Sequence, residues 1–169
     1  MTARVFVDTS VLLYALDAAE PAKQPRAQAW LEHLWQTRMG RTSVQVLSEC
    51  YVNLKRMAGP RLAASQAWES VARYFAWKPL ASDEALLLRA REIEQRHRIN
   101  WWDCLVVGAA QMQDCDMLLT EDLQDRAVYG SVRVRSPFTL AIEEQASAYA
   151  VRPAPAPRHR PRGRPAKRA

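Results

Sequence analysis

Arg4-Val5-Phe6-Val7-Asp8-Thr9-Ser10 is the stretch of sequence from which the rest of the chain can be placed. Three consecutive apolar residues are typical of a strand buried on both faces, and the polar residues after them predict a turn into a helix over 11–16. We expect Thr9 or Ser10 to cap that helix. In open parallel sheets, ligands bind outside the carboxyl ends of the strands, so the Asp8 carboxylate stands where such a protein carries out its chemistry. A plain capping turn is the alternative interpretation.

Length and composition indicate one globular domain. The chain has 169 residues, 49% of them hydrophobic, which is enough for a substantial core. No apolar run approaches the roughly 20 residues that span a bilayer, and the N-terminus lacks a signal-peptide pattern, so we expect a cytoplasmic protein. The three cysteines form no paired motif and are odd in number, which argues against zinc and against a disulfide framework. We expect them to be small core residues.

The basic charge is concentrated at the C-terminus. The whole chain carries a net charge of +6, yet residues 151–169 hold seven basic residues and no acidic one, which leaves 17 basic and 18 acidic residues in 1–150. Five prolines in the same segment exclude a regular helix, so we expect it to be disordered. We therefore divide the chain into a folded domain over 1–138, a helical extension over 139–150 and a basic tail over 151–169.

Helical and strand patterns alternate along the folded part. Helices are predicted over 23–38, 44–56, 62–75, 82–95 and 101–110, and strands over 5–7, 41–43, 77–80, 116–120 and 132–135. We expect the last strand to be a half-exposed edge strand, because its apolar and basic residues alternate. These elements predict helices packed around a sheet.

Four acids stand at informative positions. Asp8 and Asp122 each come within three residues of the end of an apolar strand. Asp103 stands at the start of a helix that is apolar around nearly its whole circumference, and capping is its alternative role. Glu49 lies about 150° from the apolar stripe of its helix, so periodicity alone predicts a solvated residue.

These segments together resemble the PIN-domain family, in particular its VapC-type toxin–antitoxin ribonucleases. The matching pieces are Val7-Asp8-Thr9-Ser10, Ser43-Val-Gln-Val-Leu-Ser-Glu49, Trp102-Asp103-Cys-Leu-Val-Val107 and Leu119-Thr-Glu-Asp122, with Val134-Arg-Ser-Pro-Phe138 at the end of the core. The resemblance covers about residues 4–138. It implies an α/β/α sandwich with a short central parallel sheet, at whose carboxyl ends the four acids converge on a divalent metal, Mg²⁺ or Mn²⁺.

The activity that this resemblance implies is metal-dependent cleavage of RNA phosphodiester bonds by the toxin of a type II toxin–antitoxin system. A small antitoxin protein is then the expected partner, and we expect a homodimer. Asp8, Asp103 and Asp122 are the expected metal ligands, held directly or through water. Glu49 is expected either to bind the metal or to orient the attacking water. Carboxylates from several elements suit Mg²⁺, which keeps part of its water shell beside a phosphate.

Residues around the four acids have two interpretations each. By resemblance to the family, Thr120 would hydrogen-bond the acids and orient Asp8, as would Ser10, while a turn or cap is the structural alternative for both. The pair Trp101-Trp102 could stack on an unpaired base, but we favour packing against the sheet for tryptophans in an apolar stretch. Glu121 and Asp125 are interpreted as solvated loop residues.

The tail departs from the family pattern. Pro161-Arg162-Gly163-Arg164-Pro165 resembles the core of an AT-hook, which would lay Arg162 and Arg164 in the minor groove of A·T-rich DNA. Non-specific attraction to phosphates is the interpretation that we favour, because such a motif arises easily in an Arg/Pro-rich segment. Two other functions are compatible with the sequence, namely a PIN-like nuclease that processes RNA or DNA and a catalytically vestigial module that binds nucleic acid. The four acids favour an active nuclease.

Overall fold

A five-stranded sheet with the strand order β2-β1-β3-β5-β4 forms the centre of the computed structural model, which describes residues 3–57, 64–140 and 142. The strands are β1 (Arg4–Val7), β2 (Gly40–Arg41), β3 (Cys115–Leu119), β4 (Val128–Tyr129) and β5 (Val132–Arg135). β1 pairs in parallel with β2 and β3, and β3 pairs in parallel with β5, whereas β4 and β5 form an antiparallel hairpin. The expected α/β fold with a mostly parallel sheet is confirmed.

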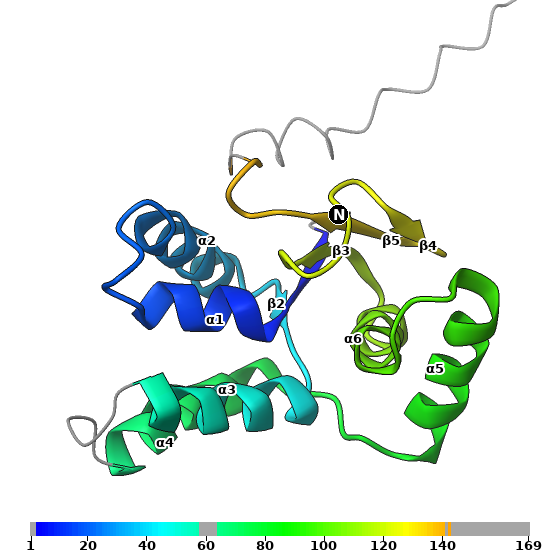
Figure 1. Cartoon of the computed structure of the whole chain (residues 1–169), viewed down its shortest axis with the longest axis horizontal. Coiled ribbons are helices and arrows are strands. Elements are labelled where there is room, and N and C mark those ends of the chain that lie inside the picture. Colours follow the sequence, from blue (N-terminus) through cyan, green and yellow to red (C-terminus); the bar gives the residue numbers. More distant parts are fainter. Residues whose placement is uncertain (1–2, 58–63, 141, 143–169) are drawn as a thin grey trace, which may run out of the picture.

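Helices surround this sheet. They are α1 (Thr9–Leu16), α2 (Gln24–Thr37), α3 (Val44–Met57), α4 (Ala64–Ala72), α5 (Glu84–His97) and α6 (Trp101–Met112), with the 3-10 segment η2 (Arg73–Trp77) after α4. Figure 1 shows α1 and α2 to one side of the sheet and α5 and α6 to the other, while α3 lies alongside α1 and α4 packs on α3. The strand predicted over 77–80 is wrong, because η2 occupies its start and Leu80 forms only an isolated bridge with Ser43.

The core follows the apolar runs that the sequence singled out. Val5, Phe6 and Val7 of β1 are completely buried, and α6 is buried continuously over 104–110. The three cysteines are free and buried, as expected, and burial raises the pKa of the Cys50 thiol to about 12. These thiols are therefore packing groups. No helix in the described ranges is long and apolar enough to cross a bilayer.

The buried face of α5 is set by the neighbouring helix. Leu86 is buried, whereas Leu88, two positions further along, is 60% exposed. The reason in α5 is its contact with α6, where a Cβ at Gly108 would come 3.2 Å from Leu86 Cδ1. The small glycine admits Leu86, so the interface selects the face that α5 buries.

The end of the folded part is tied down by hydrogen bonds to α2. The Arg26 guanidinium donates to the Phe138 carbonyl at 2.6 Å, and Trp30 Nε1 donates to the Leu140 carbonyl at 3.2 Å. The prediction that β5 is an edge strand is wrong, because the two-residue β4 pairs along its outer side. Most of the helix predicted over 139–150 and the whole tail over 151–169 lie outside the described residues.

The other edge of the sheet is β2, also two residues long. The indole of Trp77 lies against it so closely that a Cβ at Gly40 would come 2.5 Å from the ring. Any other residue at position 40 would have to displace this indole. One face of β2 is therefore covered by an aromatic side chain.

Candidate active site

Asp8 occupies the carboxyl end of β1, where the parallel register with β3 brings it beside Thr120. Val7 is paired with Leu119, so the residues that follow these two positions are neighbours. The Thr120 hydroxyl donates to Asp8 Oδ2 at 2.7 Å, and the Thr9 N–H donates to Asp8 Oδ1 at 2.7 Å. Asp8 is itself the N-cap of α1, so the expectation that Thr9 or Ser10 caps this helix is wrong.

Glu49 reaches the same site from the second turn of α3. Its Oε2 accepts a hydrogen bond from the Thr9 hydroxyl at 3.1 Å, and its Oε1 accepts one from Gln45 Nε2 at 3.0 Å. The side chain is partly buried, so the solvated residue that periodicity alone predicts is wrong. The polar side of α3 faces the end of the sheet, and helical periodicity does not distinguish that surface from bulk water.

Asp103 and Asp122 are each anchored by a hydrogen bond that their own backbone N–H donates to a neighbouring side chain. Asn100 is the N-cap of α6 and its Oδ1 accepts from the Asp103 N–H at 3.0 Å, while its amide nitrogen donates to Asp103 Oδ2. The capping alternative for Asp103 is thus wrong, because Asn100 fills that role. The Asp122 N–H donates to Thr120 Oγ1 at 3.1 Å, so a single hydroxyl links Asp122 with Asp8.

The four carboxylates share one electrostatic field. Burial raises the pKa of Asp8 from 3.8 to about 7, the Thr120 and Thr9 hydrogen bonds oppose the rise, and the charges of Asp122 and Glu49 add to it. Burial also raises the pKa of Asp103, and the charges of Asp122 and Glu49 again contribute. Asp122 and Glu49 therefore lie within electrostatic reach of both Asp8 and Asp103.

The donor set suits a hard divalent cation. Carboxylate oxygens are the ligands that Mg²⁺ and Mn²⁺ prefer, and over the described ranges none of the four acids has an ion-pair partner. No group of three or more His, Cys, Asp or Glu side chains in that part of the chain is arranged to hold an ion. A metal here would therefore bind to one or two carboxylates directly and to the others through water, as Mg²⁺ commonly does.

A cavity of about 410 Å³ opens beside the acids, between α1 and α3. It is lined by Thr9, Ser10, Leu13, Tyr14, Asp17, Glu49, Asn53, Met57 and Asp122. Ser10 turns its hydroxyl oxygen to the Glu121 N–H at 3.5 Å, and no hydrogen bond joins it to the four acids in the described structure. The cavity is lined by both apolar and acidic side chains.

Two neighbouring residues differ from their favoured interpretation. Trp101 is partly buried against the core as expected, but Trp102 is 63% exposed, so packing against the sheet is wrong for Trp102. Asp125 is partly buried and accepts from Arg135 Nε, the Ser136 N–H and the Thr139 hydroxyl, so it is not a free loop residue. Glu121 is an exposed loop residue as expected, and it pairs with Lys23 at 2.8 Å.

Sequence reasoning missed two residues that orient the acids. The local sequence predicts Thr9 only as a helix cap, although the Thr9 hydroxyl donates a hydrogen bond to Glu49, 40 positions away. Asn100 precedes the buried helix in the position typical of an N-cap, and that signal could have identified it. Arg162 and Arg164 of the tail lie outside the described residues.

The sequence and the fold are both similar to known proteins. Residues 5–130 match the family model described as PIN domain. Among solved structures, the chain is similar to a toxin-antitoxin complex from Klebsiella pneumoniae at 16% identity and a TM-score of 0.58, over 79% of this chain and 97% of that chain. It is also similar to Mycobacterium tuberculosis VapC20, a sarcin-ricin loop cleaving toxin, at 22% identity and a TM-score of 0.55, over 76% and 98% of the two chains. No curated protein matches the sequence.

Proposed function

We propose, given that this chain belongs to the PIN domain family, that it is a divalent-metal-dependent endoribonuclease. The observation that carries the proposal is the Asp8 carboxylate, which is 5% exposed and surrounded by further acids at the end of a parallel sheet. A buried acid among acids destabilises a fold unless a cation joins it. Its value to the protein is therefore in binding that cation beside a phosphate.

The four acids would have different roles in the reaction. The Thr120 hydroxyl fixes Asp8 and the backbone of Asp122 together, so these two acids would present a stable pair of oxygens to the metal. Asn100 fixes Asp103, which would complete the metal site from the start of α6. When bound, the metal makes a water more acidic and offsets the negative charge that develops on the phosphate. Glu49, held by Thr9, would orient the attacking water.

The biological setting that we propose is a toxin of a type II toxin–antitoxin system. Support comes from the two similar structures, one a toxin-antitoxin complex and the other a toxin that cleaves the sarcin-ricin loop. An antitoxin segment would lay an amphipathic helix on the apolar side chains of the cavity between α1 and α3 and direct a basic side chain at the acids. Action in the cytoplasm and as a homodimer is part of the proposal.

The remaining parts of the chain keep their proposed roles. We propose a nuclease domain over 1–138 and a helical extension over 139–150. The basic tail over 151–169 would tether nucleic acid by phosphate attraction, with Arg162 and Arg164 as its candidate contacts. A tail of this kind would increase the affinity for nucleic acid without changing the rate of the chemical step.

Cleavage assays with matched aspartate variants test the nuclease. Purified protein should cleave RNA in Mg²⁺ or Mn²⁺ and stop in EDTA, and Asp8→Asn or Asp103→Asn should each slow cleavage by several orders of magnitude. Asp114→Asn is the control, because Asp114 is an exposed acid that pairs with Arg4 just before the start of β3, at the other end of that strand. Cleavage by Asp8→Asn at the wild-type rate in Mn²⁺ would refute the assignment.

Expression in a host tests the toxin separately. Wild-type protein should arrest growth, and co-expression of a short neighbouring reading frame should relieve the arrest. Harmless accumulation of full-length, active enzyme would refute the toxin role and leave the nuclease standing.

A further inference from the structure

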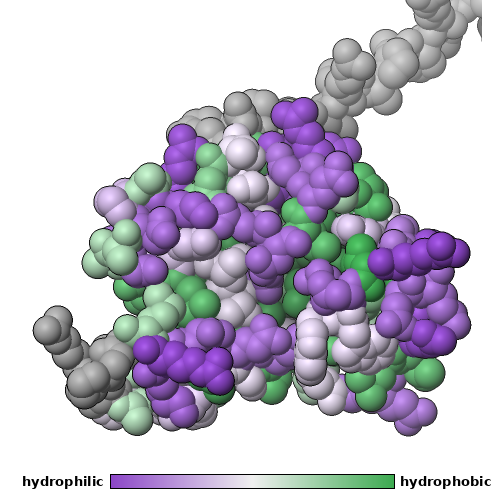
Figure 2. Space-filling view, viewed as in Figure 1, coloured by the Kyte–Doolittle hydropathy of each residue, from purple (hydrophilic) through white to green (hydrophobic). Residues whose placement is uncertain are grey.

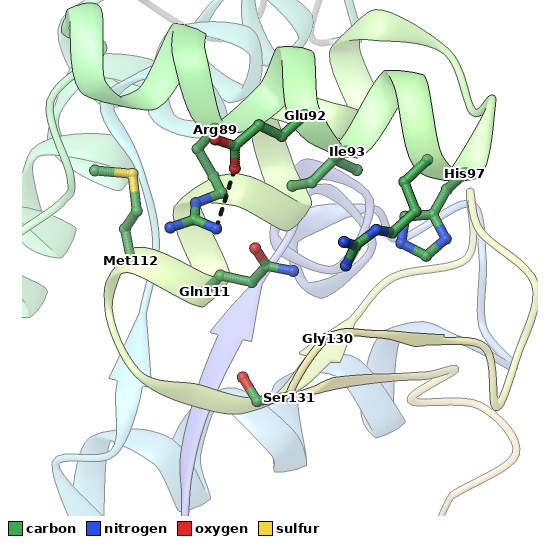
Figure 3. A pocket seen from close by; sticks show the side chains of 9 residues that line it. Arg89, Glu92, Ile93, His97, Gln111, Met112, Gly130 and Ser131 are labelled. Atoms are coloured by element: carbon green, nitrogen blue, oxygen red, sulfur yellow. Dashed lines mark ion pairs between the residues drawn. The ribbon is translucent and has the colours of Figure 1, made fainter.

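A second cavity, of about 400 Å³, lies between α5, the last turn of α6 and the β4–β5 hairpin. Figure 3 shows Arg89 and His97 of α5 above it, Gln111 of α6 beside it, and Gly130 and Ser131 of the hairpin below. None of these residues belongs to the four-acid site. The function proposed above leaves this cavity without a role.

The charged groups that line this cavity are mostly cationic. Arg89 and Arg96 face a single acid, Glu92, which pairs with Arg89 at 3.3 Å. Both partners of that pair are about half exposed or more, so the pair contributes little and Arg89 can exchange partners readily. Arg96 has no ion-pair partner within the described ranges. Figure 2 shows hydrophilic side chains gathered over α5 on this face.

Neutral hydrogen-bond donors complete the cavity. Gln111 Nε2 donates to the Tyr129 carbonyl at 2.9 Å, which fixes the amide at the cavity wall. Gly130 has a φ of +63°, and a Cβ there would come 3.0 Å from Gln111 Nε2, so the turn depends on glycine to pack against that amide. The Ser131 hydroxyl lies on the same turn. The hairpin is thereby held in place below the arginines.

One end of the cavity lies close to the four-acid site. α5 ends at His97, and three residues later Asn100, which fixes Asp103, caps α6. The His97 imidazole packs edge to face on the Tyr129 ring of the hairpin, with centroids 4.9 Å apart. A strand bound at Asp103 would therefore reach the cavity at His97.

We infer that this cavity binds backbone phosphates of the RNA strand whose scissile phosphate lies at the four acids. The inference rests on the proposed nuclease function and extends it to the path of the substrate. Guanidinium groups bind phosphate oxygens in a bidentate manner, and amide and hydroxyl donors complete such a site. The cavity is open rather than enclosed by apolar walls, which suits a strand that passes through it more than a small molecule that is engulfed.

Binding of labelled single-stranded RNA of increasing length, measured by fluorescence anisotropy in EDTA, tests the inference. Arg96→Gln should weaken binding of an RNA of about 16 nucleotides by about tenfold, lower its salt slope by about 0.7, and leave an RNA of about 4 nucleotides unaffected. Arg89→Gln should act in the same direction. Arg91→Gln is the control, since Arg91 lies on the same helix, is 60% exposed and does not line the cavity.

Several results would overturn the inference. One is equal binding by Arg96→Gln and Arg91→Gln at every RNA length. Another is a loss of inorganic phosphate binding in Arg96→Gln with no loss of RNA affinity, which would assign the cavity to a free anion. A third is a change in sedimentation alone, which would make it a contact between copies.

The same data separate this inference from the nuclease proposal. If wild-type protein cleaves RNA while Arg96→Gln binds RNA as tightly as its control, the cavity assignment is refuted and the nuclease proposal is not. If wild-type protein cleaves nothing while Arg96→Gln still weakens binding of the long RNA, the nuclease proposal is refuted and the cavity is still a phosphate-binding site. Circular dichroism melting of each variant excludes unfolding as the cause.

Discussion

Replacing Asp8 with asparagine should stabilise the metal-free protein at neutral and alkaline pH. The pKa of Asp8 is raised from 3.8 to about 7, so the folded state must give up a proton that it holds more tightly than the unfolded state. Stability is therefore complete below about pH 4 and is lost as the pH rises to 7. Asparagine does not titrate, so the free energy of unfolding of the Asp8→Asn protein should not decrease between pH 4 and pH 7 through this residue.

The size of the effect follows from the same pKa. At about 1.4 kcal/mol for each pKa unit, the rise corresponds to roughly 4 kcal/mol above pH 8. Asparagine can still accept from the Thr9 N–H, but its amide faces the Thr120 hydroxyl, whose proton must turn away at a cost of about 1 kcal/mol. The net gain is about 3 kcal/mol, or about 6 to 12 °C in Tm for a domain of this size.

Urea unfolding in EDTA at several pH values between 4 and 8.5 measures this difference. At pH 4 the Asp8→Asn protein should be less stable than the wild type by up to about 1 kcal/mol, because the cost at Thr120 remains. It should become the more stable protein as the pH rises and reach a plateau near pH 8. Adding Mn²⁺ should raise the stability of the wild type and narrow the gap. A variant that is less stable than the wild type by the same amount at every pH would mean that Asp8 is a structural cap, and the reasoning would be refuted.

Three further predictions concern residues around the site. Asp125→Asn should destabilise the protein by about 1 kcal/mol in urea unfolding above pH 5, because backbone and side-chain donors lower the pKa of this acid against the opposing effect of burial; the loss should shrink on acidification. Trp102→Ala should weaken binding of unpaired RNA in EDTA by about 1–3 kcal/mol while Trp102→Phe preserves most of it, and Trp68→Ala, also half exposed, should have no effect. Removal of residues 151–169 should leave kcat unchanged but flatten the salt dependence of RNA binding; an unchanged salt slope would exclude a tether.

The location of Asp8 could be predicted from sequence because it depends on one rule. The carboxyl ends of parallel strands lie at the same edge of the sheet, so acids that follow apolar runs come together there, independently of the helices between the strands. The structure brings Asp8 and the segment around Asp122 together through a single threonine. The resemblance to the family predicts the supporting role of Thr120, and the geometry of the hydrogen bonds gives it a physical basis.

The features that the sequence did not predict depend on contacts between segments that are distant in the chain. Periodicity records which side of α3 is polar, but it does not show that this side meets the Thr9 hydroxyl, so Glu49 resembled a surface residue. The buried face of α5 was likewise selected by a glycine on another helix. The two residues of β4 are too few to carry any alternation, and without β4 the neighbouring β5 looked like an edge.

The two short outer strands limit how this protein can meet other chains. An exposed strand edge offers unpaired N–H and C=O groups that another polypeptide can extend, and long edges invite aggregation. Here one edge offers only the two residues of β2, and the other offers only the two residues of β4. A protein partner thus has little backbone to pair with and must recognise side chains on the helices. Inhibitors based on extended peptides should accordingly fail where helical ones succeed.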